Sequence, residues 1–355
     1  MKAQISKTHS HADIATLSLP THSEHCITVQ ASEHWKMDAL LRQAAEKRSA
    51  TLLSQFVFAG THHYEESADA VWLQGDACDD GDLYSMQAVA LSGLDLQPLH
   101  FNGRDIGFTY EDDSASYCRL RGITPQDLNA SRADQTRSAF EILNAALNAA
   151  GFQFIDTVRT WIYLDRLLEW YDDFNAVRTA FFEETGIFDS MVPASTGIGA
   201  ANQFGSAIMM DVLAVKPKND RLKIQAVDSP LQNPALDYKS SFSRAVEMAY
   251  STHKNLLISG TASIDPDGHT VHQDVPEKQI RLTLDVVHAI LESRGMGWGD
   301  LFRGIAYFKD MAYQPIYEKV ALELGIPHFP LAISHADVCR HDLLFEIEVD
   351  AVKIA

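Results

Sequence analysis

The sequence has few cysteines, no CxxC motif and no long apolar run, and each absence excludes a class of protein. Its 4 cysteines are scattered over 355 residues, which argues against a disulfide framework or a zinc ribbon and fits a reducing compartment. No segment is apolar over the length that a membrane span requires, and the first residues lack the apolar core of a signal peptide. We therefore expect a cytoplasmic protein that does not act at a membrane.

Basic residues are also scarce. Lys and Arg number 29 against 48 Asp and Glu, which gives a formal net charge of -19 and a pI near 5.1. Proteins that bind nucleic acid usually carry a basic surface, so we expect no nucleic-acid partner and no RNA cleavage. Because an acidic surface repels anions at long range, an anionic substrate would need a local cluster of Arg inside a pocket.

An internal repeat organises the chain. Residues 135–151 (QTRSAFEILNAALNAAG) have apolar side chains at helical spacing and end in Gly151, and residues 279–295 show the same pattern 144 positions later. Asp156, Arg159 and Tyr163 recur as Asp300, Arg303 and Tyr307 in the segments that follow. The other predicted pairs are front strands 117–122 and 256–260, middle strands 156–165 and 300–309, second helices 170–182 and 314–324, and closing strands 209–216 and 346–353. The repeat predicts strand, helix, strand, helix and strand, used twice.

The repeat sets the expected domain boundaries. We predict an α+β protein with a first domain at 110–217 and a second at 235–355, each a mixed sheet with helices packed on one face. Residues 218–234, rich in Pro and polar side chains, are interpreted as a linker. Residues 1–109 have no counterpart in the second half, so they are expected to be an extension that packs on the first domain.

The repeat unit resembles the Rid/YjgF family, through the helix ending in Gly295, the strand FRGIAYFKD and the closing EIEVDAVKI. A tandem chain of this length with an N-terminal extension resembles the chorismatases within that superfamily. The segments FNAVRTAFF (174–182), PASTGIG (193–199) and CRHDLLFEIE (339–348) carry this narrower resemblance. It implies a chorismate-mutase-like fold and conversion of chorismate into 3-hydroxybenzoate and pyruvate, with no metal or organic cofactor and most of the active site in the second domain.

Two other functions stay open at this stage. Rid imine deaminases hold the substrate carboxylate with an Arg before the closing hairpin, but residues 329–338 contain none, which disfavours a deaminase. A non-catalytic protein that binds a small molecule is the second alternative. Rid proteins commonly form trimers, and a tandem chain could satisfy that interface internally, so both a monomer and a homotrimer are compatible with the sequence.

Glu346 is the predicted catalytic acid. It opens the closing strand among Leu344, Phe345 and Ile347, and apolar surroundings raise the pKa of a carboxyl group. The resemblance implies that this Glu protonates the enolpyruvyl methylene. The alternative is a surface residue on an edge strand. Glu348 has the same parity along the strand and is a reserve candidate.

Cys339 is predicted to lie beside this acid. If a tight hairpin turned between positions 342 and 343, Cys339 and Glu346 would face each other across it. The alternative is a small buried side chain without a role. By resemblance, Cys at this position marks chorismatases that form 3-hydroxybenzoate, whereas a smaller residue marks those that form a cyclohexadiene diol. Ala262 is assigned to the same product-determining surface.

Substrate carboxylates call for Arg, whose planar guanidinium binds them in a bidentate manner. Arg178 lies in the apolar stripe of the predicted helix 170–182, where a bound anion would explain it and an internal carboxylate is the alternative. Tyr117, Arg119 and Arg121 alternate along a strand and therefore share one face, which is either an anion site or a solvated surface. Arg340 adjoins Cys339 and is a further candidate.

Glycines and histidines add weaker signals. Gly197, in the TGIG segment, is predicted to let a ligand approach the backbone closely. His9 and His11, and His62 and His63, have no carboxylate or Cys cluster at metal-site spacing, so they are interpreted as surface residues rather than metal ligands. No phosphate-binding loop or dinucleotide fingerprint is present.

Overall fold

The computed structural model describes residues 2–9, 11–31, 33–60, 70–75, 83–238 and 240–355. His62, His63 and Cys78 lie outside the described residues. Within the described ranges, no helix has the length and apolar character needed to cross a membrane.

Three mixed sheets form the protein, and we name the segments that build them the first, second and third units (residues 4–92, 97–217 and 222–354). The first unit contains β1 (Gln4–His9), β2 (Asp13–Ser18), β3 (Ser23–Val29), α1 (His34–Glu46), β4 (Thr51–Ala59), β5 (Val71–Gln74) and β6 (Leu83–Ser92). The second contains β7 (Gln97–Phe101), β8 (Arg104–Glu111), β9 (Ala115–Ile123), α2 (Arg132–Ala149), β10 (Thr157–Leu164), α3 (Tyr171–Thr185), β11 (Ala194–Gly199), β12 (Ala201–Asn202) and β13 (Ile208–Pro217). The third contains β14 (Leu222–Val227), β15 (Ala245–Tyr250), β16 (His253–Ala262), α4 (Pro276–Ser293), β17 (Leu301–Phe308), α5 (Gln314–Glu323), β18 (Leu331–His335) and β19 (Phe345–Ile354).

The three sheets share one strand order. It runs β1-β2-β3-β6-β4-β5 in the first unit, β7-β8-β9-β13-β10-β11 in the second and β14-β15-β16-β19-β17-β18 in the third. In each unit the last two strands of this order pair in parallel, and β12 crosses from the second unit to pair with β5. The fold is therefore a threefold repetition of one α+β unit.

The helices and strands predicted from the repeat are confirmed. The repeated acidic residues also have one structural role, because each closes a single 3-10 turn before its strand. Asp156 Oδ2 accepts a hydrogen bond from the Gln153 N–H at 2.8 Å, and Asp300 Oδ2 accepts one from the Gly297 N–H at 2.9 Å. This shared cap fixes where β10 and β17 begin.

The prediction of only two such units is wrong, and its boundaries differ from the observed ones. The N-terminal segment builds its own sheet, while β7 and β8, expected in the extension, pair with the second unit's sheet. The expected linker contains β14, which pairs with β15. Ser54 helps to explain why the sequence repeat did not predict the first unit. It follows the same strand irregularity as Arg159 and Arg303, so the arginine that marks the repeat is absent there.

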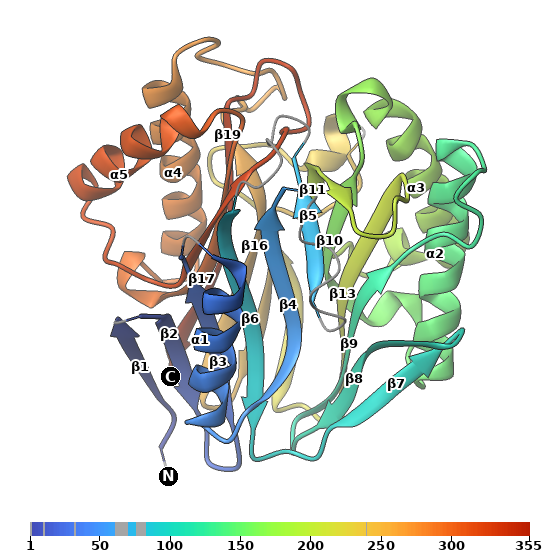
Figure 1. The fold of residues 1–355 in the computed structure, drawn as a ribbon, viewed down its shortest axis with the longest axis vertical. Coiled ribbons are helices and arrows are strands. Elements are labelled where there is room, and N and C mark those ends of the chain that lie inside the picture. The colour runs from blue at the N-terminus through green and yellow to red at the C-terminus, as the bar shows by residue number, and fades with distance from the viewer. Residues whose placement is uncertain (1, 10, 32, 61–69, 76–82, 239) are drawn as a thin grey trace.

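Each sheet has helices on its outer face, and the inner faces meet at the centre of the molecule. Figure 1 shows α4 and α5 at one side, α2 and α3 at the other, and the sheets between them. Three apolar cores each join one sheet to its own helices, and a fourth, central core combines strands from all three units. Burial between the units therefore fixes their relative positions.

Candidate active site

A polar cavity lies between the second and third units. Its walls come from α3 and β11 of the second unit, and from residues 240–244, β16, residues 339–340 and β19 of the third. The inner cavity has a volume of about 40 Å³ and adjoins a surface groove of about 1090 Å³. The inner cavity is lined by Tyr171, Arg178, Ser195, Gly197, Ser240, Phe242, Arg244, Gly260, Ala262, Ile264, Cys339, Arg340 and Glu346.

Glu346 is the one carboxyl group among the described residues lining the inner cavity. It lies on a central strand rather than an edge, because β19 pairs with both β16 and β17 and places Glu346 between Ala262 and Tyr307. The residue is only 5% exposed. Burial, together with the charge of Glu348, raises the pKa of Glu346 to about 8. Near neutral pH this carboxyl group is mainly protonated and can donate its proton into the cavity.

Gly260 makes room for that carboxyl group. A Cβ at this position would overlap Glu346 Oε1, so no larger residue fits without moving the acid. The amide N–H of Gly260 donates to Thr196 Oγ1 at 3.1 Å, which ties β16 to β11 across the two units. The glycine and this hydrogen bond hold the acid against the cavity wall.

Glu348 lies on the same face of β19 but in a closed network. It accepts hydrogen bonds from Arg159 Nη2 at 2.9 Å, Arg303 Nη2 at 2.5 Å and Trp161 Nε1 at 2.8 Å. The two guanidinium groups lower the pKa of Glu348 despite complete burial. Glu348 therefore stays ionised and bound, which leaves Glu346 as the carboxyl group able to supply a proton.

Three arginines line the same cavity. Arg178 Nη2 donates to Asn175 Oδ1 at 2.6 Å, and its guanidinium lies 5.0 Å from the Phe174 ring centre. Arg244 Nη2 donates to the Asn233 carbonyl at 2.7 Å, and Arg340 Nη1 donates to the Gly268 carbonyl at 2.7 Å. Arg178 and Arg244 are almost fully buried. With Glu346 protonated, the ionisable groups of the wall make the cavity cationic, in a protein whose net charge is -19.

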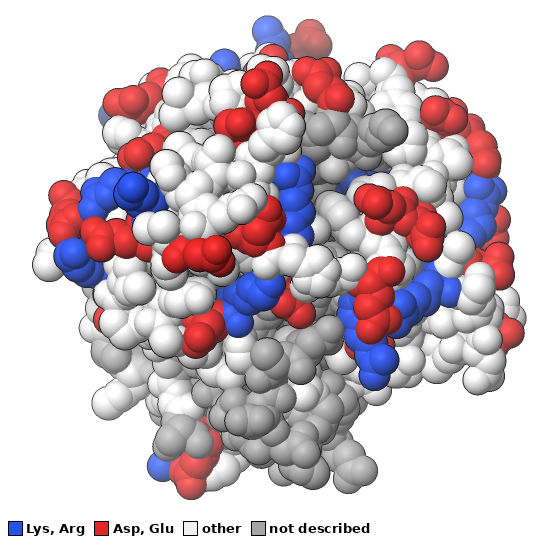
Figure 2. Space-filling view, turned by 90° about the horizontal axis from the view of Figure 1, so that it is seen from above, with Lys and Arg blue, Asp and Glu red and all other residues white. Residues whose placement is uncertain are grey.

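The surrounding surface is mixed. Figure 2 shows the face seen from above, where a group of basic side chains lies near the middle and acidic side chains surround it. The outer groove includes Glu169, Asp172, Asp173 and Glu183 in its walls. Acidic side chains therefore outnumber basic ones in the outer groove, where Arg340 is shared with the inner cavity.

Cys339 lines the cavity with Glu346, but not through the predicted hairpin. β18 ends at His335, and residues 339–344 form a turn in which the Leu343 N–H donates to the Arg340 carbonyl at 3.3 Å. Cys339 therefore does not lie on a strand paired with Glu346. Burial and the neighbouring Glu346 raise the pKa of Cys339 to about 12. The side chain is thus a neutral thiol that shapes the cavity near the acid.

Gly197 and Ala262, two of the predicted site residues, also line this cavity. The N–H groups two positions before and after Gly197 on β11 point away from β10. The Ser195 N–H donates to Ser259 Oγ at 2.9 Å, and the Gly199 N–H donates to the Asp337 carbonyl at 2.8 Å. Because N–H directions alternate along a strand, the Gly197 N–H points to the same side, into the cavity. Nothing lies within 4 Å of a Cβ built on Gly197, so a ligand could approach its backbone.

Tyr117 and Arg119 do not reach this cavity, which corrects their predicted placement with the substrate. They line a separate central cavity between the three units. There Arg119 Nε donates to Ser54 Oγ at 2.9 Å, and the Tyr117 hydroxyl donates to Asp112 Oδ2 at 3.1 Å. Their strand, β9, lies in the middle of the second sheet, so its inner face meets the other units instead of the Glu346 cavity.

Arg121 is likewise absent from the walls of that cavity. Its guanidinium lies 5.8 Å from the Phe108 ring centre. The alternation of β9 left both an anion site and a solvated surface open, and it could not tell which part of the molecule the face meets.

Seven of the lining residues were not predicted from the sequence, and Arg244 and Tyr171 are the two of these with ionisable side chains. Arg244 directly precedes β15, and an Arg immediately before an apolar strand was the one available signal. Tyr171 begins α3 and faces Cys339 and Glu346. Burial raises the pKa of its hydroxyl group, and the charged forms of Cys339 and Glu346 raise that pKa further. Neither residue stands near Glu346 in the sequence, so only the packing of the second and third units brings them together.

The chain is similar to known proteins over most of its length. Residues 233–353 match the family model described as Endoribonuclease L-PSP. A 3-hydroxybenzoate synthase of Streptomyces hygroscopicus is 26% identical over 275 residues, covering 70% of this chain and 77% of that protein. A chorismatase of Streptomyces rapamycinicus is 28% identical over 237 residues, covering 58% of this chain and 68% of that protein. A crystal structure of a chorismatase covers 94% of this chain and 100% of its own, with a TM-score of 0.69 at 21% identity, and shares the fold.

Proposed function

The chain belongs to the chorismatase family within the Rid/YjgF superfamily, and from this premise we propose that it converts chorismate into 3-hydroxybenzoate and pyruvate. The observation that carries the proposal is the pairing of one buried, protonated carboxyl group with three arginines in a single cavity. An acid of raised pKa and a cationic wall together suit a dianionic enol ether.

The arginines would bind the two carboxylates of chorismate. Arg178 and Arg244 lie on opposite units, so a substrate between them would be held from both sides. The Gly197 N–H supplies a further donor for a carboxylate oxygen or an oxyanion. Because the inner cavity is small, a bound substrate extends toward the groove, where Tyr171 and Arg340 also line the wall.

Glu346 supplies the proton that begins the reaction. Protonation of the enolpyruvyl methylene carbon gives an oxocarbenium-like centre and turns the side chain into a leaving group. The family resemblance implies that the neighbouring ring hydroxyl then displaces it, forming an arene oxide that opens to the aromatic product. Pyruvate leaves with the ether oxygen, a ring proton returns to the enzyme during aromatisation, and the sum of products equals the substrate.

Cys339 bears on the choice of product. It lines the cavity beside the acid as a neutral thiol, and by resemblance a Cys here accompanies formation of 3-hydroxybenzoate. Ala262 pairs directly with Glu346 on the neighbouring strand and also lines the cavity. Replacement of the thiol by a smaller side chain would admit water to the reacting centre and favour a diol.

The test is incubation of the purified protein with chorismate, followed by chromatography for pyruvate and the ring product. Pyruvate with 3-hydroxybenzoate is the expected result, and Cys339→Ala is expected to divert part of the flux to the diol. Pyruvate with another ring product from the unchanged protein would keep the family reaction and overturn the role given to Cys339. Absence of pyruvate would overturn the proposed function.

A further inference from the structure

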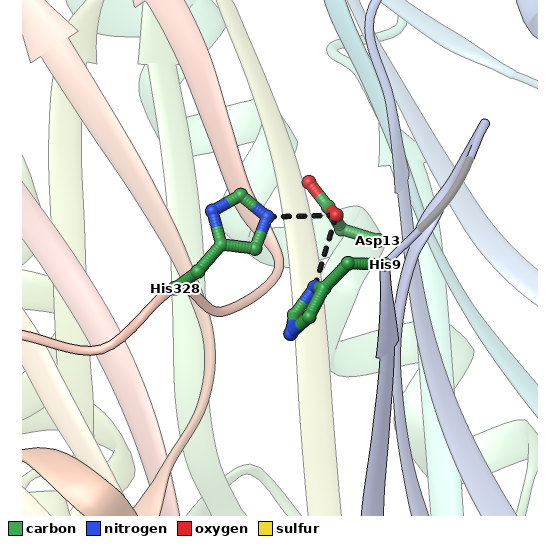
Figure 3. A group of neighbouring side chains, drawn as sticks. All are labelled: His9, Asp13 and His328. Carbon is green, nitrogen blue, oxygen red and sulfur yellow. Dashed lines mark hydrogen bonds and ion pairs between the residues drawn. The ribbon is translucent and has the colours of Figure 1, made fainter.

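Two histidines and a carboxylate meet at a surface site remote from the cavity. His9 Nδ1 lies 3.1 Å from Asp13 Oδ1, and His328 Nε2 lies 2.8 Å from the same oxygen. The ligand atoms of all three residues lie within 4.8 Å of one another. Figure 3 shows both imidazole rings turned toward the carboxylate, with His328 approaching from a different part of the chain.

The backbone holds these side chains in place from two directions. His9 and Asp13 are paired residues of the β1–β2 hairpin, so they project from one face of it. His328 lies between α5 and β18, flanked by Pro327 and followed by the buried Phe329, which anchors that connection. The site therefore joins the N-terminal hairpin to the third unit.

The donor set and its spacing suit a transition-metal ion. Neutral imidazole nitrogen and carboxylate oxygen are common zinc ligands, and three protein ligands with a water complete a tetrahedral site. Two donors at roughly 2.0–2.2 Å from a tetrahedral ion lie about 3.3 Å apart. The observed separations of 3.1 and 2.8 Å are close to that value, so small movements of exposed side chains would admit the ion.

A second group with similar residue types differs in construction. Asp265, Asp267 and His269 come from one five-residue turn, and the His269 backbone N–H already binds Asp265 Oδ1 at 2.8 Å. That hydrogen bond explains the turn without a ligand. His328, in contrast, reaches the hairpin from a distant segment, and its ring also packs edge to face on that of His9, with the ring centres 4.3 Å apart.

We propose that His9, Asp13 and His328 form a binding site for Zn²⁺ that fastens the N-terminal hairpin to the third unit, which replaces the sequence-based interpretation of His9 as a surface residue without a metal-binding role. The hairpin's other described contacts with that unit include the Lys7 Nζ hydrogen bond to the Gly299 carbonyl at 3.1 Å and a small apolar cluster containing Phe302. An ion shared by both sides adds a cross-link between segments far apart in the sequence. Because it binds the folded chain, it also stabilises that state.

The experiment uses the full chain without a histidine tag, stripped with a chelator and titrated with ZnCl₂ by calorimetry. His9→Ala and His328→Ala test the site. His11→Ala is a matched control on the same hairpin, and His269→Ala removes the other candidate group. Circular dichroism and the unfolding midpoint without metal establish that each variant is folded.

One high-affinity Zn²⁺ per chain is expected in the unchanged protein and in both controls, with a rise in the unfolding midpoint. Each of the two test variants should bind at least about tenfold more weakly and lose that rise. Unchanged affinity in a folded His328→Ala variant, or no binding by the unchanged protein, would overturn the proposal. Loss of binding in His269→Ala alone would assign the ion to the other group and would also overturn it.

Discussion

Glu346 and Glu348 lie two positions apart on the same face of β19, and their pKa values are displaced in opposite directions. Adjacent buried carboxyl groups resist ionising together, so the structure must decide which one carries the charge. Arg159 and Arg303 form ion pairs with Glu348 and so stabilise its ionised form. Burial and the negative charge of Glu348 together keep Glu346 protonated. Arg159 comes from the second unit and Arg303 from the third, so the repeated arginines of both units bind the same carboxylate, Glu348.

The first prediction concerns the pH dependence of turnover. Because the proposed reaction requires a protonated Glu346, kcat should be constant below its pKa of about 8 and fall about tenfold per pH unit well above it. Glu346→Gln should lower kcat by about 10³-fold, because general acid catalysis commonly contributes that much. A pH–rate profile of both proteins checks this. Full activity in the Gln variant would show that another group supplies the proton.

The same pKa shift affects stability. The folded-state pKa of Glu346 is raised from 4.5 to about 8, so the favourable neutral form is fully present below the lower value and is lost as pH rises through the upper one. Glu346→Gln keeps a neutral side chain at every pH. The difference in unfolding free energy between this variant and the unchanged protein should therefore grow in favour of the variant between pH 5 and 8, by on the order of 4 kcal/mol. Denaturant titrations at several pH values measure the difference, and a difference that stays constant with pH would contradict the buried acid.

Substitution of Glu348 should have the opposite effect and destabilise the protein. Glu348→Gln leaves two buried guanidinium groups without their shared anion, and loss of one partner of a buried ion pair costs about 3–5 kcal/mol. Denaturant unfolding measures this cost. Glu184→Gln is a suitable control, because it removes an exposed partner of Arg137 and should change stability little. A small effect at Glu348 would show that the network does not hold the units together.

The sequence predicted two helices and three strands in each of the second and third units because their apolar spacing and capping residues are local. Asp156 and Asp300 determine where their strands begin through contacts three residues away. The first unit shares only the strand order, and Ser54 stands where the other units have an arginine. Strand order is set by pairing between residues distant in sequence, so no local sequence pattern predicted the first unit.

For the candidate site, the sequence located the acid and its immediate neighbours but not the whole wall. Glu346, Cys339 and Arg340 belong to one short segment, and the cavity includes all three. Arg244 joins them through packing between residues distant in sequence. Arg119 shows the converse error, because strand parity indicated a polar face but not that this face meets the central cavity.

Arg178 is expected to act in substrate binding. A charged hydrogen bond to a carboxylate contributes about 1.5–3 kcal/mol, so Arg178→Ala should raise KM for chorismate roughly 10- to 100-fold. Arg178→Lys should recover only part of this loss, because Lys cannot make the planar, paired contact. Steady-state kinetics test both variants beside Arg137→Ala, whose described ion pairs are exposed and involve α2 and α3. An unchanged KM in Arg178→Ala would remove it from the substrate site.

Gly260 provides a test that alters the acid's position without touching its chemistry. A Cβ there would overlap Glu346 Oε1, so Gly260→Ala must push the carboxyl group out of its place or shift β16. Either displacement should lower kcat at least about 100-fold, because misplacement by an ångström can cost that much. Gly299→Ala is the matched control, since nothing lies within 4 Å of its Cβ. If Gly260→Ala stays folded and fully active, the described position of Glu346 is not the one in which it transfers its proton; if activity falls while the control is unaffected, the space left by this glycine is part of the catalytic geometry.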